Sequence, residues 1–314
     1  MQIMADIFLC EDVSRLTKHQ SFLFIGDSNM RAIYKDLVWL SNPSHQDSLI
    51  PVHHLREKME KSYEGDALID SSGLTAGRDY RETRDFFSQG NDTQFTFHFV
   101  TRCFSPRLQE SLRTWKREFG SYPDVIVMNG ALWDLSRWGV NAVVSYKESI
   151  IKLFELLKEL LPPYTQVIWL TSTPVSRKVK GGIILPQIQS IGETLRFTIV
   201  EANRYAARVA SSHGFDVLDI HGSFICQMHR QCSDGIHWHP DSVRMMVNMI
   251  LTHFSLSRNC KLPGRIPPSQ SVLLRQMLFA RDEALTLPPG GPHHEGEEEA
   301  GRQRVVLRAR RRIL

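Results

Sequence analysis

The stretch Phe22-Leu-Phe-Ile-Gly-Asp-Ser-Asn29 decides the fold class of this chain. It is an apolar run that stops at a glycine, an aspartate and a serine, and helix-forming sequence follows from Met30 to Leu40. This order predicts a buried strand, a tight turn and a helix. Such a turn places the Ser28 hydroxyl at the carboxyl end of a parallel strand, beside the free N–H groups of a helix N-terminus, where a developing oxyanion is stabilised. The arrangement suits acyl transfer, with Ser28 as the nucleophile.

A second segment, Asp234-Gly-Ile-His-Trp-His-Pro240, supplies the partners that such a serine needs. Serine is a poor nucleophile until a base removes its proton, and His237 could do so if the fold brings it within hydrogen-bond reach. Asp234, three residues earlier, could fix the imidazole tautomer. The two segments together predict a triad of Ser28, His237 and Asp234.

Strands and helices alternate along the chain. Short runs rich in β-branched and aromatic residues predict buried strands at Phe22–Ile25, Phe95–Thr101, Val125–Met128, Val167–Thr171 and Phe215–Leu218. The clearest helical stretches are Met30–Leu40, Leu108–Phe119, Ala142–Leu161, Glu193–Ser211 and Asp241–Phe254. The alternation predicts an α/β fold, a three-layer α/β/α sandwich with a central parallel sheet of about five strands.

Ligands bind at the carboxyl ends of the strands in such a sheet, and the candidate residues follow strands there. Ser28 follows the first strand, Asn129 follows Val125–Met128, and Asp234 and His237 lie in the loop before the last helix. We therefore expect one site, in which the backbone N–H of Ser28 and the side-chain amide of Asn129 stabilise the oxyanion.

The domain organisation follows from changes in composition. Residues 1–20 form a lead-in with a helix around Ala5 to Leu16, and residues 21–258 form the α/β domain. Within the domain, residues 42–90 are polar and irregular, and this long insertion could cover the site or form part of a binding wall. Residues 259–314 are rich in proline and glycine, then glutamate, then arginine, and we expect a disordered tail.

The composition of the chain limits the classes of function that we expect. The chain has 314 residues, 42% hydrophobic, and a net charge of +4, too small to argue for nucleic-acid binding. No apolar stretch approaches the ~20 residues that span a bilayer, so no transmembrane segment is expected. The odd, sparse set of five cysteines favours reduced thiols and an intracellular, cytoplasmic protein. The basic cluster Arg302 to Arg312 leaves nuclear localisation open, and the sequon Asn91-Asp-Thr93 matters only in a secreted chain.

An ordered set of motifs resembles the GDSL/SGNH hydrolases, and within them the PC-esterase group. The motifs are Gly26-Asp27-Ser28, Tyr80-Arg-Glu-Thr-Arg84, Met128 to Trp138, Phe215-Asp-Val-Leu-Asp219 and Asp234-Gly-Ile-His-Trp238, within roughly residues 21 to 256. The resemblance implies cofactor-free esterase or acyltransferase chemistry on O-acylated, often carbohydrate-linked, substrates. It assigns Ser28 as nucleophile, His237 as base and Asp234 as the partner of the base.

The sequence departs from the wider family in two blocks that supply oxyanion donors. The third block keeps Asn129 but lacks the flanking glycine and aspartate, and the second block has as its candidate only Gly77, in Ala76-Gly-Arg-Asp-Tyr80. Loss of one donor typically costs ~100–1,000-fold in turnover, which predicts a slow enzyme. The alternative is an SGNH-fold interaction domain that is catalytically weak or inactive.

Several candidate residues also have structural interpretations. Ser28 could merely cap the following helix, and Asp27 is expected to hold the turn through backbone contacts. The pair His237 and His239, near Cys232, invites a metal interpretation, but no further ligand has a suitable spacing and no metal is expected.

Aromatic and basic residues near the motifs likewise have both a functional and a structural interpretation. The tryptophans Trp133, Trp138 and Trp238 could stack on a substrate, although packing is the commoner role. Four arginines could recognise an anionic substrate, although solvated or salt-bridged side chains are the default; they are Arg81, Arg84, Arg102 and Arg137.

Overall fold

The computed structural model describes residues 5–45, 47–74, 77–139, 141–180 and 191–265. Within these ranges one mixed sheet carries seven strands, in the order β2-β3-β4-β1-β5-β6-β7. Their bounds are β1 (Ser21–Gly26), β2 (Ala67–Ser71), β3 (Glu82–Ser88), β4 (Thr93–Phe99), β5 (Val125–Met128), β6 (Gln166–Leu170) and β7 (Asp216–Leu218). Neighbouring strands from β4 to β7 in this order are parallel, whereas β2 and β3 are antiparallel to their neighbours.

The five predicted strands are all present, and they form the parallel part of the sheet. The expected parallel sheet of about five strands is thus confirmed, and the antiparallel strands β2 and β3 extend it to seven from within the insertion that was predicted to be irregular. Two of the buried residues of β3 are charged, Glu82 and Arg84, and β2 is largely exposed or half-exposed. Neither strand therefore shows the apolar run that identifies a buried strand in a sequence.

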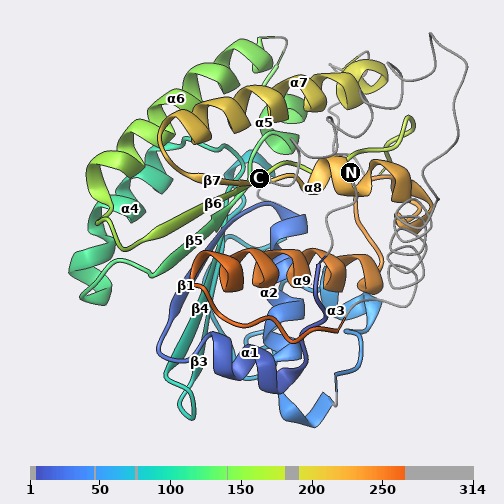
Figure 1. The fold of residues 1–314 in the computed structure, drawn as a ribbon. Coiled ribbons are helices and arrows are strands. Elements are labelled where there is room, and N and C mark those ends of the chain that lie inside the picture. The colour runs from blue at the N-terminus through green and yellow to red at the C-terminus, as the bar shows by residue number, and fades with distance from the viewer. Residues whose placement is uncertain (1–4, 46, 75–76, 140, 181–190, 266–314) are drawn as a thin grey trace, which may run out of the picture. The chain divides into compact units, whose positions relative to one another are not determined.

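Helices cover both faces of the sheet (Figure 1), with α1, α2, α3 and α9 on one face and α4 to α7 on the other. Their bounds are α1 (Cys10–Leu16), α2 (Ser28–Leu40), α3 (Val52–Arg56), α4 (Pro106–Phe119), α5 (Leu132–Arg137), α6 (Ala142–Leu160), α7 (Ile191–Ser212), α8 (Ile220–Phe224) and α9 (Pro240–Ser257). The five long helices that the sequence predicts are confirmed to within a few residues, whereas the lead-in helix α1 is shorter than expected. The three-layer α/β/α architecture is likewise confirmed.

The central strand β1 shows why the sequence encodes two cores. Phe22 and Phe24 pack into the core beneath α2 and α9, while Leu23 and Ile25 pack into the core beneath α4 to α7. Alternate side chains of a strand point to opposite faces, so a strand buried on both faces reads as a continuous apolar run. The chain also passes from one side of β1 to the other between β4 and β5, which creates a topological switch point at the carboxyl end of β1.

The lead-in and residues 259–265 lie together. The Asp6 carboxylate accepts the backbone N–H groups of Gly264 and Arg265, at 2.6 Å each, and Val13 of α1 is fully buried in the core. Residues 259–265, predicted to belong to the tail, are thus hydrogen-bonded to the lead-in. The rest of the predicted tail, residues 266–314, lies outside the described residues. No helix in the described ranges is both long enough and apolar enough to cross a bilayer.

A buried ion pair joins α2 to α9. The Arg244 guanidinium donates to both carboxylate oxygens of Asp36, Nε at 2.7 Å and Nη2 at 3.0 Å, and the Asp36 side chain is fully buried. Arg244 also donates to the carbonyl oxygen of Ser48 at 3.2 Å. The pair matters for the site because α2 starts at Ser28 and α9 follows the loop that carries His237.

Arg244→Met should lower the free energy of unfolding by about 3–5 kcal/mol, because it leaves the Asp36 carboxylate buried without a counter-charge. Urea denaturation of the single variant and of the double variant Asp36→Leu/Arg244→Met measures the effect. The double variant should recover most of the loss, since it removes both charges. A loss below about 1 kcal/mol in the single variant would show that the pair is not desolvated as described.

Candidate active site

The turn between β1 and α2 is shaped by Gly26. A Cβ atom at this position would lie 2.1 Å from Oδ1 of Asn129 and 2.7 Å from Cβ of Met30, so only glycine allows this close approach. Asp27 is the N-cap of α2, and its carboxylate accepts the N–H of Asn29 at 2.8 Å. Asp27 thus holds the turn, as expected. It also takes the capping role that Ser28 could have had.

Ser28, His237 and Asp234 form a continuous chain of hydrogen bonds. Ser28 Oγ lies 2.8 Å from Nε2 of His237, and Nδ1 of His237 lies 2.8 Å from Oδ2 of Asp234. Because an ionised carboxylate can only accept, the imidazole donates through Nδ1, and Nε2 is left to accept the Ser28 hydroxyl proton. The structure therefore brings the three predicted residues together, from two segments far apart in the sequence.

The loop before α9 holds His237 firmly. Oδ1 of Asp234 accepts the backbone N–H groups of Ile236 and His237, each at 3.0 Å, so one carboxylate fixes both the loop and the ring. The N–H of Cys232 donates to the carbonyl of His237 at 2.7 Å and closes the loop from the other side. Gly235 has a φ of +75°, and a Cβ there would lie 2.7 Å from Cβ of Ser176. The position of the histidine three residues after the aspartate follows from this closed geometry.

The electrostatics of the loop favour an ionised Asp234. Burial works to raise the pKa of its carboxyl group, but the N–H groups of His237 and Ile236 and the imidazole outweigh burial, so the pKa lies below its ordinary value of 3.8. Arg56 adds a distant positive charge, with Nη2 3.7 Å from Oδ2. A permanent negative charge beside Nδ1 stabilises an imidazolium when His237 takes a proton.

The two other oxyanion candidates occupy different places. Asn129 follows β5, donates its backbone N–H to the carbonyl of Ile25 at 3.0 Å, and packs its side chain against Gly26. Its Oδ1 is buried and has no hydrogen-bond partner among the described residues. Gly77 begins a short 3₁₀ turn and lines the cavity above Ser28. The roles of Asn129 and Gly77 as donors stay predictions.

A cavity of about 480 Å³, here called the Ser28 pocket, opens at Ser28, Asp234 and His237. The insertion forms part of its wall through residues that include Leu55, Leu74 and Tyr80, as the sequence suggested. Arg31, which also lines the cavity, was not among the residues predicted from the sequence. Its position three residues after Ser28 on α2, and hence on the same face of the helix, is the signal that could have identified it.

The metal interpretation of His237 and His239 finds no support in their surroundings. Both ring nitrogens of His237 are engaged by Ser28 and Asp234, and His239 is the exposed N-cap residue of α9. Within the described ranges, the ligand atoms of His53, His54 and Glu57 lie within 4.8 Å of one another, and this group includes none of the residues in the predicted loop.

The chain has relatives among known proteins. No family model matches it. The human PC-esterase domain-containing protein 1A is 35% identical over 265 residues, which are 83% of this chain and 57% of that protein. The human PC-esterase domain-containing protein 1B is 33% identical over 301 residues, which are 94% of this chain and 65% of that protein.

The chain is a homologue of the PC-esterase domain-containing proteins. The resemblance found in its motifs is thereby confirmed. The chain spans 57% and 65% of the length of these two human relatives.

Solved structures with a similar arrangement include two esterase-type proteins. The acetyl xylan esterase AlAXEase gives a TM-score of 0.45 at 9% identity, covering 74% of this chain and 98% of that chain. The lipase/acylhydrolase from Enterococcus faecalis gives a TM-score of 0.40 at 14% identity, covering 79% of this chain and 97% of that chain.

In this PC-esterase homologue, the lowered pKa of Asp234 predicts a pH-dependent contribution to stability. A carboxyl group with a pKa lowered by folding stabilises the protein above its unfolded pKa, and this contribution is lost as the pH falls through the folded pKa. Asp234→Asn should therefore unfold at a lower urea concentration than the wild type at about pH 6, and the difference should shrink below about pH 4.

Urea midpoints measured across this pH range test the expectation, with Ser233→Ala as a control in the same loop that removes no charge. A difference between Asp234→Asn and the wild type that stayed constant down to about pH 3 would contradict it.

Proposed function

We propose that this chain is a serine esterase or O-acyltransferase that acts on O-acylated substrates, acetylated carbohydrates among them, through Ser28, His237 and Asp234. The observation that carries the proposal is the pair of 2.8 Å contacts that link the Ser28 hydroxyl to the imidazole and the imidazole to the carboxylate. The esterase class also agrees with the names of its relatives. The substrate class rests on the family resemblance of the motifs.

In the first half of the reaction, Ser28 Oγ attacks the ester carbonyl carbon while His237 Nε2 takes the hydroxyl proton. Asp234 keeps the imidazole in the required tautomer and stabilises the imidazolium. The carbon–oxygen bond to the leaving alcohol then breaks, His237 returns the proton to that alcohol, and the acyl group remains on Ser28. The Ser28 backbone N–H is a suitable oxyanion donor, since the first N–H groups of a helix have no intrahelical acceptor.

In the second half, His237 deprotonates the acceptor that attacks the acyl-enzyme. Water as acceptor gives the free acid, and a sugar hydroxyl gives a transferred ester; in both cases the bond from Ser28 Oγ to the acyl carbon breaks and the proton returns to Oγ. The side-chain amide of Asn129 and the N–H of Gly77 are the further oxyanion donors in this proposal. An oxyanion site with fewer well-placed hydrogen-bond donors would slow both halves of the reaction without changing their order.

The full chain should be labelled by a fluorophosphonate probe, which reacts with an activated serine and requires no knowledge of the substrate. Ser28→Ala and His237→Ala should abolish labelling and lower hydrolysis of an activated ester by about a thousand-fold or more, because triad members act as a unit. Ser233→Ala, which changes an exposed serine next to Asp234, should still be labelled.

Circular dichroism establishes that each variant is folded. Labelling that persists in folded Ser28→Ala would refute the assignment of the nucleophile. A folded wild type that is neither labelled nor active would favour the alternative of a non-catalytic interaction domain.

A further inference from the structure

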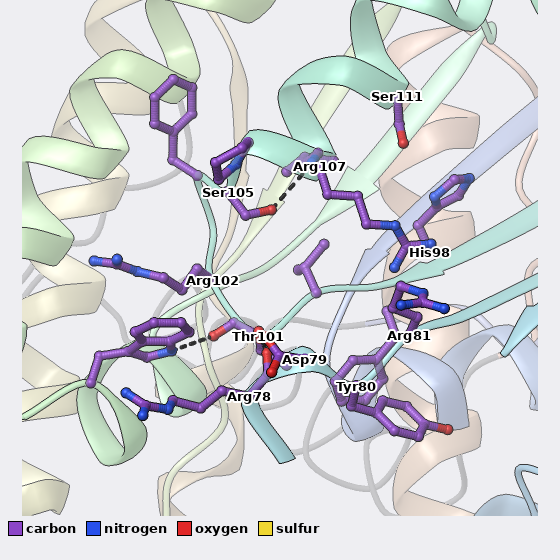
Figure 2. Close-up of a pocket in the computed structure, with 16 residues that line it drawn as sticks. Arg78, Asp79, Tyr80, Arg81, His98, Thr101, Arg102, Ser105, Arg107 and Ser111 are labelled. Carbon is purple, nitrogen blue, oxygen red and sulfur yellow. Dashed lines mark hydrogen bonds between the residues drawn. The ribbon is translucent and has the colours of Figure 1, made fainter. Parts of the chain in front are cut away.

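A second cavity, of about 440 Å³, lies where β4 ends and α4 begins (Figure 2). It is lined by four arginines, Arg78, Arg81, Arg102 and Arg107, and is here called the arginine pocket. Tyr80 and Phe99 line both this cavity and the Ser28 pocket, and their rings pack edge to face with centroids 4.7 Å apart. The two cavities therefore share an aromatic wall.

The charges of the arginine pocket do not balance. Two of the arginines face one carboxylate, since Asp70 pairs with Arg107 and lies 3.4 Å from Nε of Arg81. Asp79 supplies a carboxylate to the wall itself. Four guanidinium groups against these two carboxylates leave an excess of two positive charges.

The excess is concentrated at Arg78 and Arg102. Their guanidinium carbons lie 5.1 Å and 4.5 Å from the centroid of the same indole ring, that of Trp138. No carboxylate oxygen lies within 4.0 Å of either group in the ranges that the structure describes, although the charge of Arg102 reaches the buried carboxyl group of Asp134. Like charges held beside one ring repel each other, and an anion bound next to them would offset this repulsion.

Polar atoms in the wall lack partners in the protein. Nε of Arg102 and Nε2 of His98 are buried and have no hydrogen-bond partner among the described residues. Burial, with the nearby charge of Arg107, lowers the pKa of His98 to about 4, so its imidazole is neutral at pH 7. Buried polar atoms are normally hydrogen-bonded, so these two leave hydrogen-bonding capacity unused in the side chains of the wall, although Nη2 of Arg102 donates to Ser145 Oγ at 2.5 Å.

The start of α4 adds to the positive potential. Ser105 is the N-cap of this 14-residue helix and accepts the N–H of Leu108 at 3.2 Å, and both residues line the pocket. Figure 2 shows Ser105 with Arg78 and Arg102 toward one side of the cavity, and Arg81, Arg107 and His98 toward the other. A helix N-terminus favours anions, and guanidinium forks match the oxygens of sulfate and phosphate groups.

The Ser28 pocket continues this positive lining across the shared wall. Five basic residues line it, namely Arg31, Arg56, Lys58, Arg137 and Lys180, against the single carboxylate of Asp234. Arg31 is paired with the buried Glu82, Nε to Oε2 at 2.7 Å, and Arg56 lies near Asp234, Nη2 to Oδ2 at 3.7 Å. A molecule that spans both cavities would meet a basic surface along its length.

We propose that the arginine pocket binds a sulfate or phosphate group carried by the ester that Ser28 attacks, so that the substrate is an anionic ester. The part of this inference that concerns the substrate rests on the proposed function, whereas the anion site itself does not. Arg78 and Arg102 hold the group by charge-assisted hydrogen bonds, and the acyl ester lies across the aromatic wall at Ser28.

The anion site is tested by isothermal titration of the full chain with inorganic sulfate and with inorganic phosphate. The double variant Arg78→Gln/Arg102→Gln should bind either ion roughly ten-fold more weakly or worse, because it removes two charged donors. Arg102→Lys, which keeps the charge and loses the fork, should give an intermediate affinity. Arg113→Gln, which changes an exposed arginine elsewhere on α4, is the matched control. Circular dichroism confirms that the variants are folded.

The substrate class is tested by the kinetics of two esters, an O-acetylated monosaccharide and the same compound with a sulfate ester on a neighbouring hydroxyl. The sulfated ester should have a kcat/KM roughly ten-fold higher or more, mainly through a lower KM, and this ratio should fall toward one in the double variant. A phosphorylated counterpart shows which of the two oxyanions the site prefers.

Each outcome decides one part of the inference. Titration that detects no ion, or equal affinity in the double variant, would overturn the anion site. Ion binding lost in the variant without a preference for the charged ester would overturn the assignment to the substrate. If ion binding is lost in the variant but the wild type hydrolyses neither these esters nor an activated ester, the proposed function fails, and the anion site stands alone.

Discussion

The buried ion pair between Asp36 and Arg244 is the constraint on which the site depends. It joins α2, which begins at Ser28, to α9, which follows the loop of His237. The pair lies well inside both helices, so it fixes their relative position, and the N-terminal ends then place the serine and the histidine 2.8 Å apart. A hydrogen bond between two turns that are remote in sequence needs such a fixed frame, because a shift of about 1 Å can cost a hundred-fold in rate.

Much of this arrangement could be predicted from the sequence because its signals are local. The apolar run of β1 and the Gly-Asp-Ser turn identify a strand end, and the loop of Asp234 and His237 precedes a proline-started helix. Topology then brings both to one edge of the sheet. The strands β2 and β3 could not be predicted, because β3 buries Glu82 and Arg84, whose charges are neutralised by ion pairs with each other and with residues such as Arg31 and Asp66. A search for apolar runs does not detect a strand whose buried charges neutralise one another only in the folded chain.

The roles of the arginines could not be predicted from the sequence either. Of those that the sequence singled out, Arg84 is fully buried among carboxylates and serves the fold, whereas Arg81 and Arg102 line the arginine pocket. Arg78 and Arg107 come from the same two segments, and Trp138 comes from a third. Only the folded structure shows that these segments meet beside the aromatic wall of the Ser28 pocket. In our proposal, the two cavities together allow the fold to select a substrate by its charge.

The role of Ser28 as nucleophile is best tested by trapping the covalent intermediate on the full chain. The protein is mixed with an activated acetyl ester, quenched in acid during turnover, digested and analysed by mass spectrometry. We expect an acetyl group on the peptide that contains Ser28, at the side chain of that residue, and its absence when His237 is replaced by alanine. Turnover without an acetylated Ser28, or an acetyl group that accumulates on another residue with the same kinetics, would contradict it.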